Sequence, residues 1–423
     1  MDTVVTGYKE RFCKGSRRIR GLIRALGLVT AWPCLPFASD VRTCGVGALT
    51  PRFMTLAFSA PQEALHGALR AASRVSSVRG ASPVLQGLLA ASGDDLVLLS
   101  GYDQALGLQV TCPAVVTNAG TAWLPAAQLC ELVGRLPAGS QVGLRVSDDG
   151  AQLHVDGDPG ARYSLSLPWS AADWPGLPQG PTGASAEIPL ALLADALARV
   201  AHCCAPEGEG KGPAEGVSLS ASAKNLQLLA SDGRRASLVS LPGLGGKWEA
   251  VISRSLAKEI SRLPGDGESM VNLSLSDGLI RAESEGAVLV ANLLSGQYPP
   301  IANAFPGNHE VLLKLKSELL IDSMSRIAVF SELAVLEINF DTSLLAISLE
   351  NDSGKGLEHI PFNPISGAGI LRLALNPKYV LTALKAVQQP DVTIGFNGSD
   401  GPVVIEAGFH RYLIMPIQVK DGV

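Results

Sequence analysis

Two similar segments recur along the chain: Glu131-Leu-Val-Gly-Arg-Leu-Pro137 and Glu259-Ile-Ser-Arg-Leu-Pro264. Both end a helical pattern at a proline, and their prolines stand 127 residues apart. A third pattern, Leu381-Thr-Ala-Leu-Lys-Ala-Val387, ends before Pro390, 126 residues after the second proline. Each is followed by alternating strand patterns split at a glycine turn. A period this long is the size of a domain, not of a solenoid repeat of roughly 20 to 50 residues. The chain is therefore predicted to use one small domain three times.

Within each repeat, a helix followed by antiparallel strands occurs twice, which indicates an internal duplication. Helices are predicted over residues 60–78, 125–136, 189–203, 253–263, 316–330 and 376–387. In the first repeat, strands are predicted over residues 84–90, 95–103, 141–146, 151–155 and 163–167. We predict an α+β fold of three tandem domains, residues 54–179, 183–303 and 307–423, each with two helices packed on antiparallel sheets.

The first 53 residues stand outside this repeat and carry nine basic residues against three acidic ones. A signal-like apolar stretch is interrupted by Arg24, and no clean small-residue cleavage site follows. We expect residues 1–53 to be a leader or a mis-annotated extension of the reading frame, and to be disordered. A transit peptide is the alternative.

The composition excludes several classes of protein. No run of eighteen apolar residues is present, so no membrane span is expected. The seven cysteines form no CxxC pair, which favours free thiols in a reducing cytosol over a zinc or redox site. The six histidines are scattered, and acidic pairs such as Asp94-Asp95 stand in predicted turns. We predict no catalytic residues, no metal and no cofactor, and hence no enzyme.

Basic residues gather on helix faces although the chain has a net charge of −5. Arg254, Lys258 and Arg262 recur every four residues and so share one face of a helix. Arg70 and Arg74 do the same in the first repeat. Single charges on the remaining helices include Arg199, Lys316 and Arg326. A solvated face explains any one of these helices, but recurrence in all three repeats favours a track for phosphates, which need no particular base sequence.

Four stretches carry a specific resemblance. They are Ala230-Ser-Asp-Gly-Arg-Arg-Ala236, Leu294-Ser-Gly-Gln-Tyr-Pro299, Leu167-Pro-Trp-Ser-Ala-Ala-Asp-Trp-Pro175 and the ending Tyr412-Leu-Ile-Met-Pro-Ile417. In their order along the chain, and on a threefold repeat, they resemble the bacterial DNA sliding clamps, the beta subunits of DNA polymerase III. The resemblance implies a homodimeric closed ring around duplex DNA, with helices inside and sheets outside, that tethers the replicative polymerase for processive synthesis.

The resemblance also implies site residues. Arg79 and Arg254 match positions that contact the DNA backbone, and the remaining DNA-binding set is chosen on charge: Arg70, Arg74, Arg199, Lys258 and Arg262. A shallow apolar pocket for a partner's short motif with Leu and Phe anchors is implied at Ser231, Gly233, Arg235, Ala236, Pro299, Ala304, Leu413, Met415 and Pro416. Arg234 and Ala236 depart from the family pattern, so the preferred anchor is open. Leu413 and Met415 fit a final core strand equally well.

The implied partners are a second copy of the chain, double-stranded DNA, the polymerase alpha subunit, the clamp loader and other proteins with a clamp-binding motif, in the bacterial cytoplasm. A repeat-built interaction scaffold without DNA in its hole is the competing hypothesis, because the chain is acidic overall.

Overall fold

The computed structural model describes residues 56–76, 82–147, 149–181, 186–209, 211–244, 246–276, 278–352 and 354–418. The predicted leader, residues 1–53, lies outside these ranges, as does Arg79. The α-helices are α2 (Gln62–Ser73), α3 (Ala126–Gly134), α4 (Leu190–Val200), α5 (Arg254–Ile260), α6 (Ser317–Phe330) and α7 (Pro377–Val387). Short 3-10 helices are η1 (Pro83–Gln86), η2 (Ala171–Asp173), η3 (Ala201–Cys203), η4 (Gly212–Glu215) and η5 (Ile301–Ala304).

The strands form antiparallel sheets. In spatial order, the first sheet is β5 (Val115–Asn118), β1 (Ala57–Pro61), β7 (Gln141–Ser147), β8 (Gly150–Val155) and β9 (Asp158–Leu165). The second is β10 (Ala186–Pro189), β15 (Met270–Ser276), β16 (Leu279–Ser284), β17 (Ala287–Asn292), β4 (Leu106–Pro113), β3 (Leu96–Tyr102), β2 (Gly87–Ser92) and β6 (Thr121–Pro125). The third is β14 (Trp248–Ser253), β11 (Gly216–Ala221), β12 (Asn225–Ser231), β13 (Arg235–Pro242), β26 (His410–Ile414), β25 (Val403–Ala407), β24 (Asp391–Phe396), β18 (Val311–Lys316) and β22 (Asn363–Ser366). The fourth is β21 (Gly354–Pro361), β20 (Leu344–Asn351), β19 (Ala334–Asn339) and β23 (Ile370–Leu375).

In the described ranges, the element order is one strand, one helix and three strands, repeated six times, with β5 and β22 as additions. Neighbouring units exchange their first strands: β1 pairs with β7 of the second unit, and β6 pairs with β2 of the first. The same exchange joins β10 to β15, β14 to β11, β18 to β24 and β23 to β19. Because each unit lends a strand to its neighbour, the units are packed in pairs.

The third strand of a unit links one pair of units to the next. Strand β4 of the first unit pairs with β17 of the fourth, and β13 of the third unit pairs with β26 of the sixth. Both junctions use the same register: Gly107 lies opposite Val290, and Ala236 lies opposite Leu413. The third strands of the second and fifth units, β9 and β21, are edge strands.

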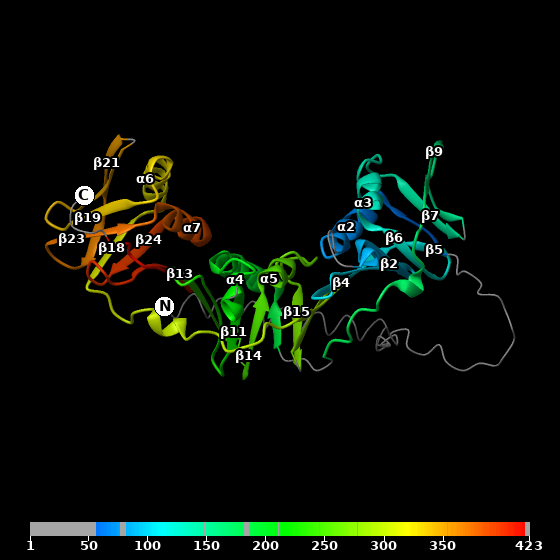
Figure 1. Ribbon diagram of the computed structural model, residues 1–423, viewed down its shortest axis with the longest axis horizontal. Helices are drawn as coiled ribbons and strands as arrows, with labels where there is room; N and C mark the ends of the chain where they lie inside the picture. Colours follow the sequence, from blue (N-terminus) through cyan, green and yellow to red (C-terminus); the bar gives the residue numbers. More distant parts are fainter. Residues whose placement is uncertain are drawn as a thin grey trace, which may run out of the picture. The chain divides into compact units, whose positions relative to one another are not determined.

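The helices cover one face of each sheet through an apolar stripe. On α4, Leu193, Leu197 and Val200 are buried in the main core, which alternate residues of the strands complete. Figure 1 shows α2 beside α3, α4 beside α5 and α6 beside α7, and residue contacts join each pair.

The predicted strand over 84–90 is wrong in its first half, because Pro83 begins a 3-10 turn before β2.

None of the helices described is long and apolar enough to cross a membrane.

Candidate functional site

Helix α5 presents the basic face that its spacing predicts. Ser253 caps it by accepting a hydrogen bond from the Leu256 N–H at 3.1 Å, and Leu256 is buried. Arg254 and Lys258 are exposed on the other side. No ion pair within the described ranges involves either side chain, so both charges are open to a polyanion.

Two other predicted DNA contacts meet at one carboxylate. Arg74 of α2 places its Nε 2.9 Å from Oε2 of Glu259, and Arg262 places NH1 3.0 Å from Oε1. The Glu259 side chain is only 9% exposed, against 27% for Arg74 and 43% for Arg262. Arg70 is exposed one helical turn before Arg74.

Arg199 is placed differently from the other predicted contacts. Its guanidinium pairs with Asp195 at 2.8 Å and donates to the Val387 carbonyl of α7 at 2.9 Å. The side chain is 19% exposed. Arg199 therefore links α4 to α7, and little of its charge faces solvent.

The predicted partner pocket lies where β13 pairs with β26. Ala236 and Leu413 face each other there, on the side of the sheet away from the helices, while Tyr412 and Ile414 point into the main core. An apolar cluster, separate from the main core, gathers on this side: Leu229, Ala236, Leu238, Phe305, Val404 and Leu413, with Tyr298 and Ile301 packed against it. The structure thus brings strands from two distant parts of the sequence to one apolar surface.

The remaining predicted pocket residues surround this cluster. Pro299 and Ala304 are exposed on the connecting segment, and Met415 is 40% exposed just after β26. The Met415 N–H donates to the carbonyl of Arg234 at 2.9 Å, which fixes the end of the strand. Leu413 is therefore a buried floor residue, and Met415 is an accessible rim residue.

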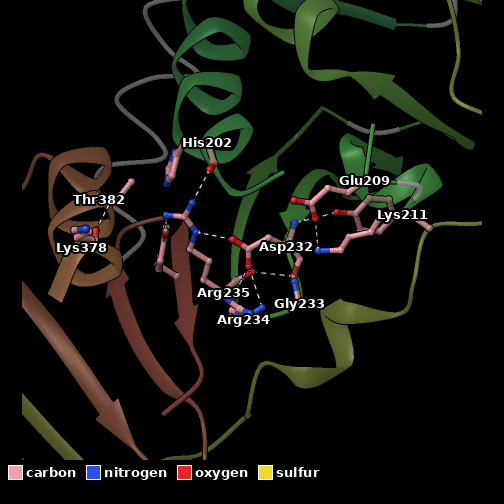
Figure 2. Close-up of polar contacts among 12 residues, drawn as sticks. His202, Glu209, Lys211, Asp232, Gly233, Arg234, Arg235, Lys378 and Thr382 are labelled. Carbon is pink, nitrogen blue, oxygen red and sulfur yellow. Dashed lines mark hydrogen bonds and ion pairs between the residues drawn. The ribbon is translucent and has the colours of Figure 1, made fainter. Parts of the chain in front are cut away.

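The turn between β12 and β13 is held by the polar network in Figure 2. The Asp232 carboxylate accepts hydrogen bonds from the backbone N–H groups of Arg234 and Arg235 at 2.9 and 3.0 Å. It also pairs with the Arg235 guanidinium at 2.9 Å. That guanidinium donates to the His202 carbonyl at 3.1 Å and stacks over the Tyr379 ring of α7 at 4.6 Å. Arg235 therefore ties the pocket turn to η3 and α7.

Ser231 and Gly233 shape the same turn. The Ser231 hydroxyl accepts from the Gly233 N–H at 3.1 Å and donates to the Arg235 carbonyl at 2.8 Å. The Ser231 N–H donates to the hydroxyl of Tyr298 at 3.0 Å. Gly233 has φ +89°, a conformation that side chains rarely adopt.

The first junction, where β4 pairs with β17, has the same strand register as the pairing of β13 with β26, but a different segment of the chain packs on it. Leu177, on the segment that follows β9, lies so close to Gly107 that a Cβ there would come within 2.4 Å of it. Leu177 is 9% exposed and packs in a cluster with Trp174. Gly107 and Val290 correspond in register to Ala236 and Leu413. The chain's own connecting segment thus covers this junction.

Sequence reasoning missed several residues of the apolar cluster, namely Leu229, Leu238, Phe305 and Val404. Alternation along β12, β13 and β25 was the available signal, since in each strand the residues of this cluster alternate with residues of the main core. Glu259 was missed because Arg74 and Arg262 were interpreted only as positive charges for DNA, and not as partners of a carboxylate.

Two imidazoles, the buried His410 and the half-buried His202, lie close to the Tyr412 ring of β26. His410 is 2% exposed, and its Nε2 lies 2.7 Å from the Ser237 hydroxyl. His202 stacks on Tyr412, with ring centroids 5.6 Å apart. Burial lowers the pKa of His410 to about 3, helped by the nearby charges of Arg199 and His202, and burial lowers the pKa of His202 to about 4. Both rings are neutral in the folded chain at neutral pH.

We expect acid to weaken the fold through these rings. Both imidazoles of the unfolded chain become protonated near pH 6.5, whereas in the folded chain they become protonated only below about pH 4. The free energy of unfolding therefore has its full value above pH 6.5 and falls as the pH drops. The free energy of unfolding should fall by about 2 kcal/mol per imidazole at pH 5. Denaturant titrations at pH 7 and pH 5 measure this fall.

The His410→Gln variant should have a flatter pH dependence than the wild type, whereas His154→Gln, at an exposed position on β8, should not. An equal fall in His410→Gln and the wild type would contradict the assignment.

The described cysteines do not form a reactive or metal-binding centre. Cys112, Cys130, Cys203 and Cys204 are free thiols. Burial raises the pKa of Cys112 to about 11, and the pKa of Cys203 and of Cys204 to about 12. Within the described ranges, no three His, Cys, Asp or Glu residues are grouped so that they could hold a metal ion.

Comparison with known families matches both ends of the described chain. Residues 56–178 match the DNA polymerase III beta subunit N-terminal domain, and residues 302–418 match its C-terminal domain. Together these matches cover more than half of the sequence.

Similar proteins and structures agree with this result. The beta sliding clamp of Synechococcus elongatus is 28% identical in an alignment of 379 positions that covers 85% of this chain and 98% of that protein. A DNA polymerase sliding clamp from Bacillus subtilis superimposes with a TM-score of 0.79 at 20% identity, over 86% of this chain and 100% of that one. A sliding clamp from Pseudomonas aeruginosa bound to griselimycin gives 0.79 at 22% identity over the same shares. At these identities the structures establish the fold.

Proposed function

Because the chain belongs to the bacterial sliding clamps, the beta subunits of DNA polymerase III, we propose that two copies close head to tail into a ring around duplex DNA. The chain is a processivity clamp of DNA replication. Such a clamp holds a polymerase on its template, and we assign the chemistry of synthesis to that partner. The proposed domains are residues 54–179, 183–303 and 307–423, each made of two of the six units.

The observation that carries the proposal is the pairing of third strands. At both internal junctions, the third strand of a domain's first unit pairs with the third strand of the next domain's second unit. Applied once more, the rule joins β21 of one chain to β9 of its partner. Both are sheet edges, and unpaired edges invite another strand. Because the contact is heterologous, repeating it closes a ring or extends a filament, and two copies with three domains each close it.

Exposed apolar side chains support the same edges as the dimer contact. Tyr163 of β9 is 38% exposed and Leu357 of β21 is 62% exposed. Val329 and Phe330 end the helix α6 beside β21 with 78% and 57% exposure. Exposed apolar side chains that gather along one strand edge and the adjacent helix end favour a partner that covers them.

The helix faces support DNA as the enclosed partner. Arg70, Arg254 and Lys258 expose their charge on the helix layer of an acidic chain, so a polyanion is attracted there and repelled elsewhere. Arg79 remains a predicted contact from the family match alone. Weak, sequence-independent contacts suffice, because a closed ring is held by topology.

The apolar cluster between β13 and β26 supports a docking surface for the clamp loader, the polymerase and other partners. Its floor is buried, and two exposed apolar residues stand next to cluster residues in the sequence: Met415, two residues after Leu413, and Pro299, which follows Tyr298. Side chains such as Leu and Phe are the anchors that this chemistry accepts.

Topology gives a direct test of the ring. A long duplex is fixed to a bead at one end, the protein is threaded over the open end, and that end is then capped with a bulky protein. We expect retention through high salt on capped DNA and release once the duplex is cut, because only enclosure resists salt.

Equal release from capped and uncapped DNA would contradict the ring and favour the scaffold alternative. Adding the cap before the protein is the matched control, and it should prevent loading.

A further inference from the structure

Glu259 is a nearly buried carboxylate held between two cations from different helices. The residue is 7% exposed and accepts from Nε of Arg74 at 2.9 Å and from NH1 of Arg262 at 3.0 Å. Arg74, the residue after the last residue of α2, is 185 residues away in the first proposed domain, and Arg262 stands two residues after the end of α5. The three groups form the triad Arg74–Glu259–Arg262, whose net charge is +1 instead of +2.

The triad contrasts with its neighbours on the same helix. Arg254 and Lys258 are exposed and take part in no ion pair within the described ranges. A carboxylate that is removed from water binds its cations more strongly than an exposed one, because the local dielectric is low. The Glu259 charge therefore offsets part of the attraction that Arg74 and Arg262 exert on a phosphate.

We propose that Glu259 withholds Arg74 and Arg262 from DNA and so keeps the grip on the duplex weak. The inference rests on the proposed enclosure of DNA and adds a residue that sets how tightly the track holds it. Each phosphate that a basic side chain neutralises steepens the dependence of binding on salt by about 0.9. A ring that must move along DNA needs few such contacts, and the triad removes part of the available charge.

Substitution of Glu259 by Gln separates this role from a structural one. The amide has one accepting oxygen and a donating nitrogen, so it can keep one guanidinium but repels the other. One cation per chain is then released to the phosphates.

We expect Glu259→Gln to steepen the plot of log K against log salt by about one per chain for a short open duplex, followed by fluorescence anisotropy. Affinity at low salt should rise severalfold. If Glu259 only braces α2 against α5, the melting temperature falls and the slope stays unchanged, which would overturn the inference.

One control variant repeats the charge change elsewhere, and a second pair of variants replaces Glu259→Gln if that variant does not fold. Glu283→Gln removes the same charge beside Arg281, 2.9 Å away on strand β16, and should leave the slope unchanged. If Glu259→Gln does not fold, the variants Arg74→Gln and Arg254→Gln are compared instead. Loss of the exposed Arg254 should reduce the slope of log K against log salt more than loss of Arg74, and an equal reduction would overturn the inference. A wild-type ring that is not retained on capped DNA would refute the enclosure itself, and no variant is needed to see that.

Discussion

Phe330→Asp should turn the ring into monomers. The side chain is 57% exposed at the end of α6, beside the β21 edge that we pair with the partner's β9. Each ring has two such contacts, and loss of a buried phenyl ring costs about 2 kcal/mol at each, before the added carboxylate is counted. The combined loss weakens dimerisation roughly a thousandfold. Sedimentation velocity at micromolar concentration measures the change directly.

Phe409→Asp is the matched control, because Phe409 is 59% exposed in the turn between β25 and β26, away from α6 and β21. It should remain a dimer. A dimeric Phe330→Asp protein would show that the copies meet elsewhere. Capped DNA provides a second measurement, since a monomer should leave it freely.

Met415→Asp should abolish most partner binding without disturbing the fold. Met415 is 40% exposed, so the carboxylate is tolerated in the free protein. In a complex it would be desolvated against an apolar anchor, and losses of about 1 to 3 kcal/mol correspond to roughly 5- to 150-fold weaker binding. A labelled peptide with Leu and Phe anchors, titrated by fluorescence, measures the loss.

Ile417→Asp offers the same exposure, 40%, two residues further along the chain and outside the proposed pocket. Its N–H donates to the Ala374 carbonyl at 2.8 Å, a backbone contact that the substitution keeps. Equal losses in the two variants would mean that the peptide responds to charge near the terminus and not to the pocket.

Local periodicity predicted the helices closely. The predicted helices 316–330 and 376–387 became Ser317–Phe330 and Pro377–Val387, because an apolar stripe specifies both the length and the buried face. Strands β4, β13 and β17 were missed, although β9, the third strand of the second unit, was predicted in part over residues 163–167. The three missed strands carry buried residues on both faces and pair with strands far along the chain, so no alternation of apolar and polar residues marks them.

In the candidate site too, features within one helix were predicted, and contacts between distant segments were not. The sequence predicted which helix faces are basic, since this depends on spacing within one helix. It could not predict that Arg74 and Arg262 share Glu259, because this depends on how α2 and α5 come together. Likewise, Arg199 was predicted to be a surface charge and instead reaches a backbone carbonyl of α7.

Leu177 packs against Gly107 at the first junction, whereas at the second junction the accessible side chain of Met415 follows the buried Leu413 two residues along the chain. If partners dock at the second junction, as we propose, each subunit has one docking surface. The proposed two-subunit ring then has two identical surfaces, so the replication proteins that bind there exclude one another until one of them dissociates.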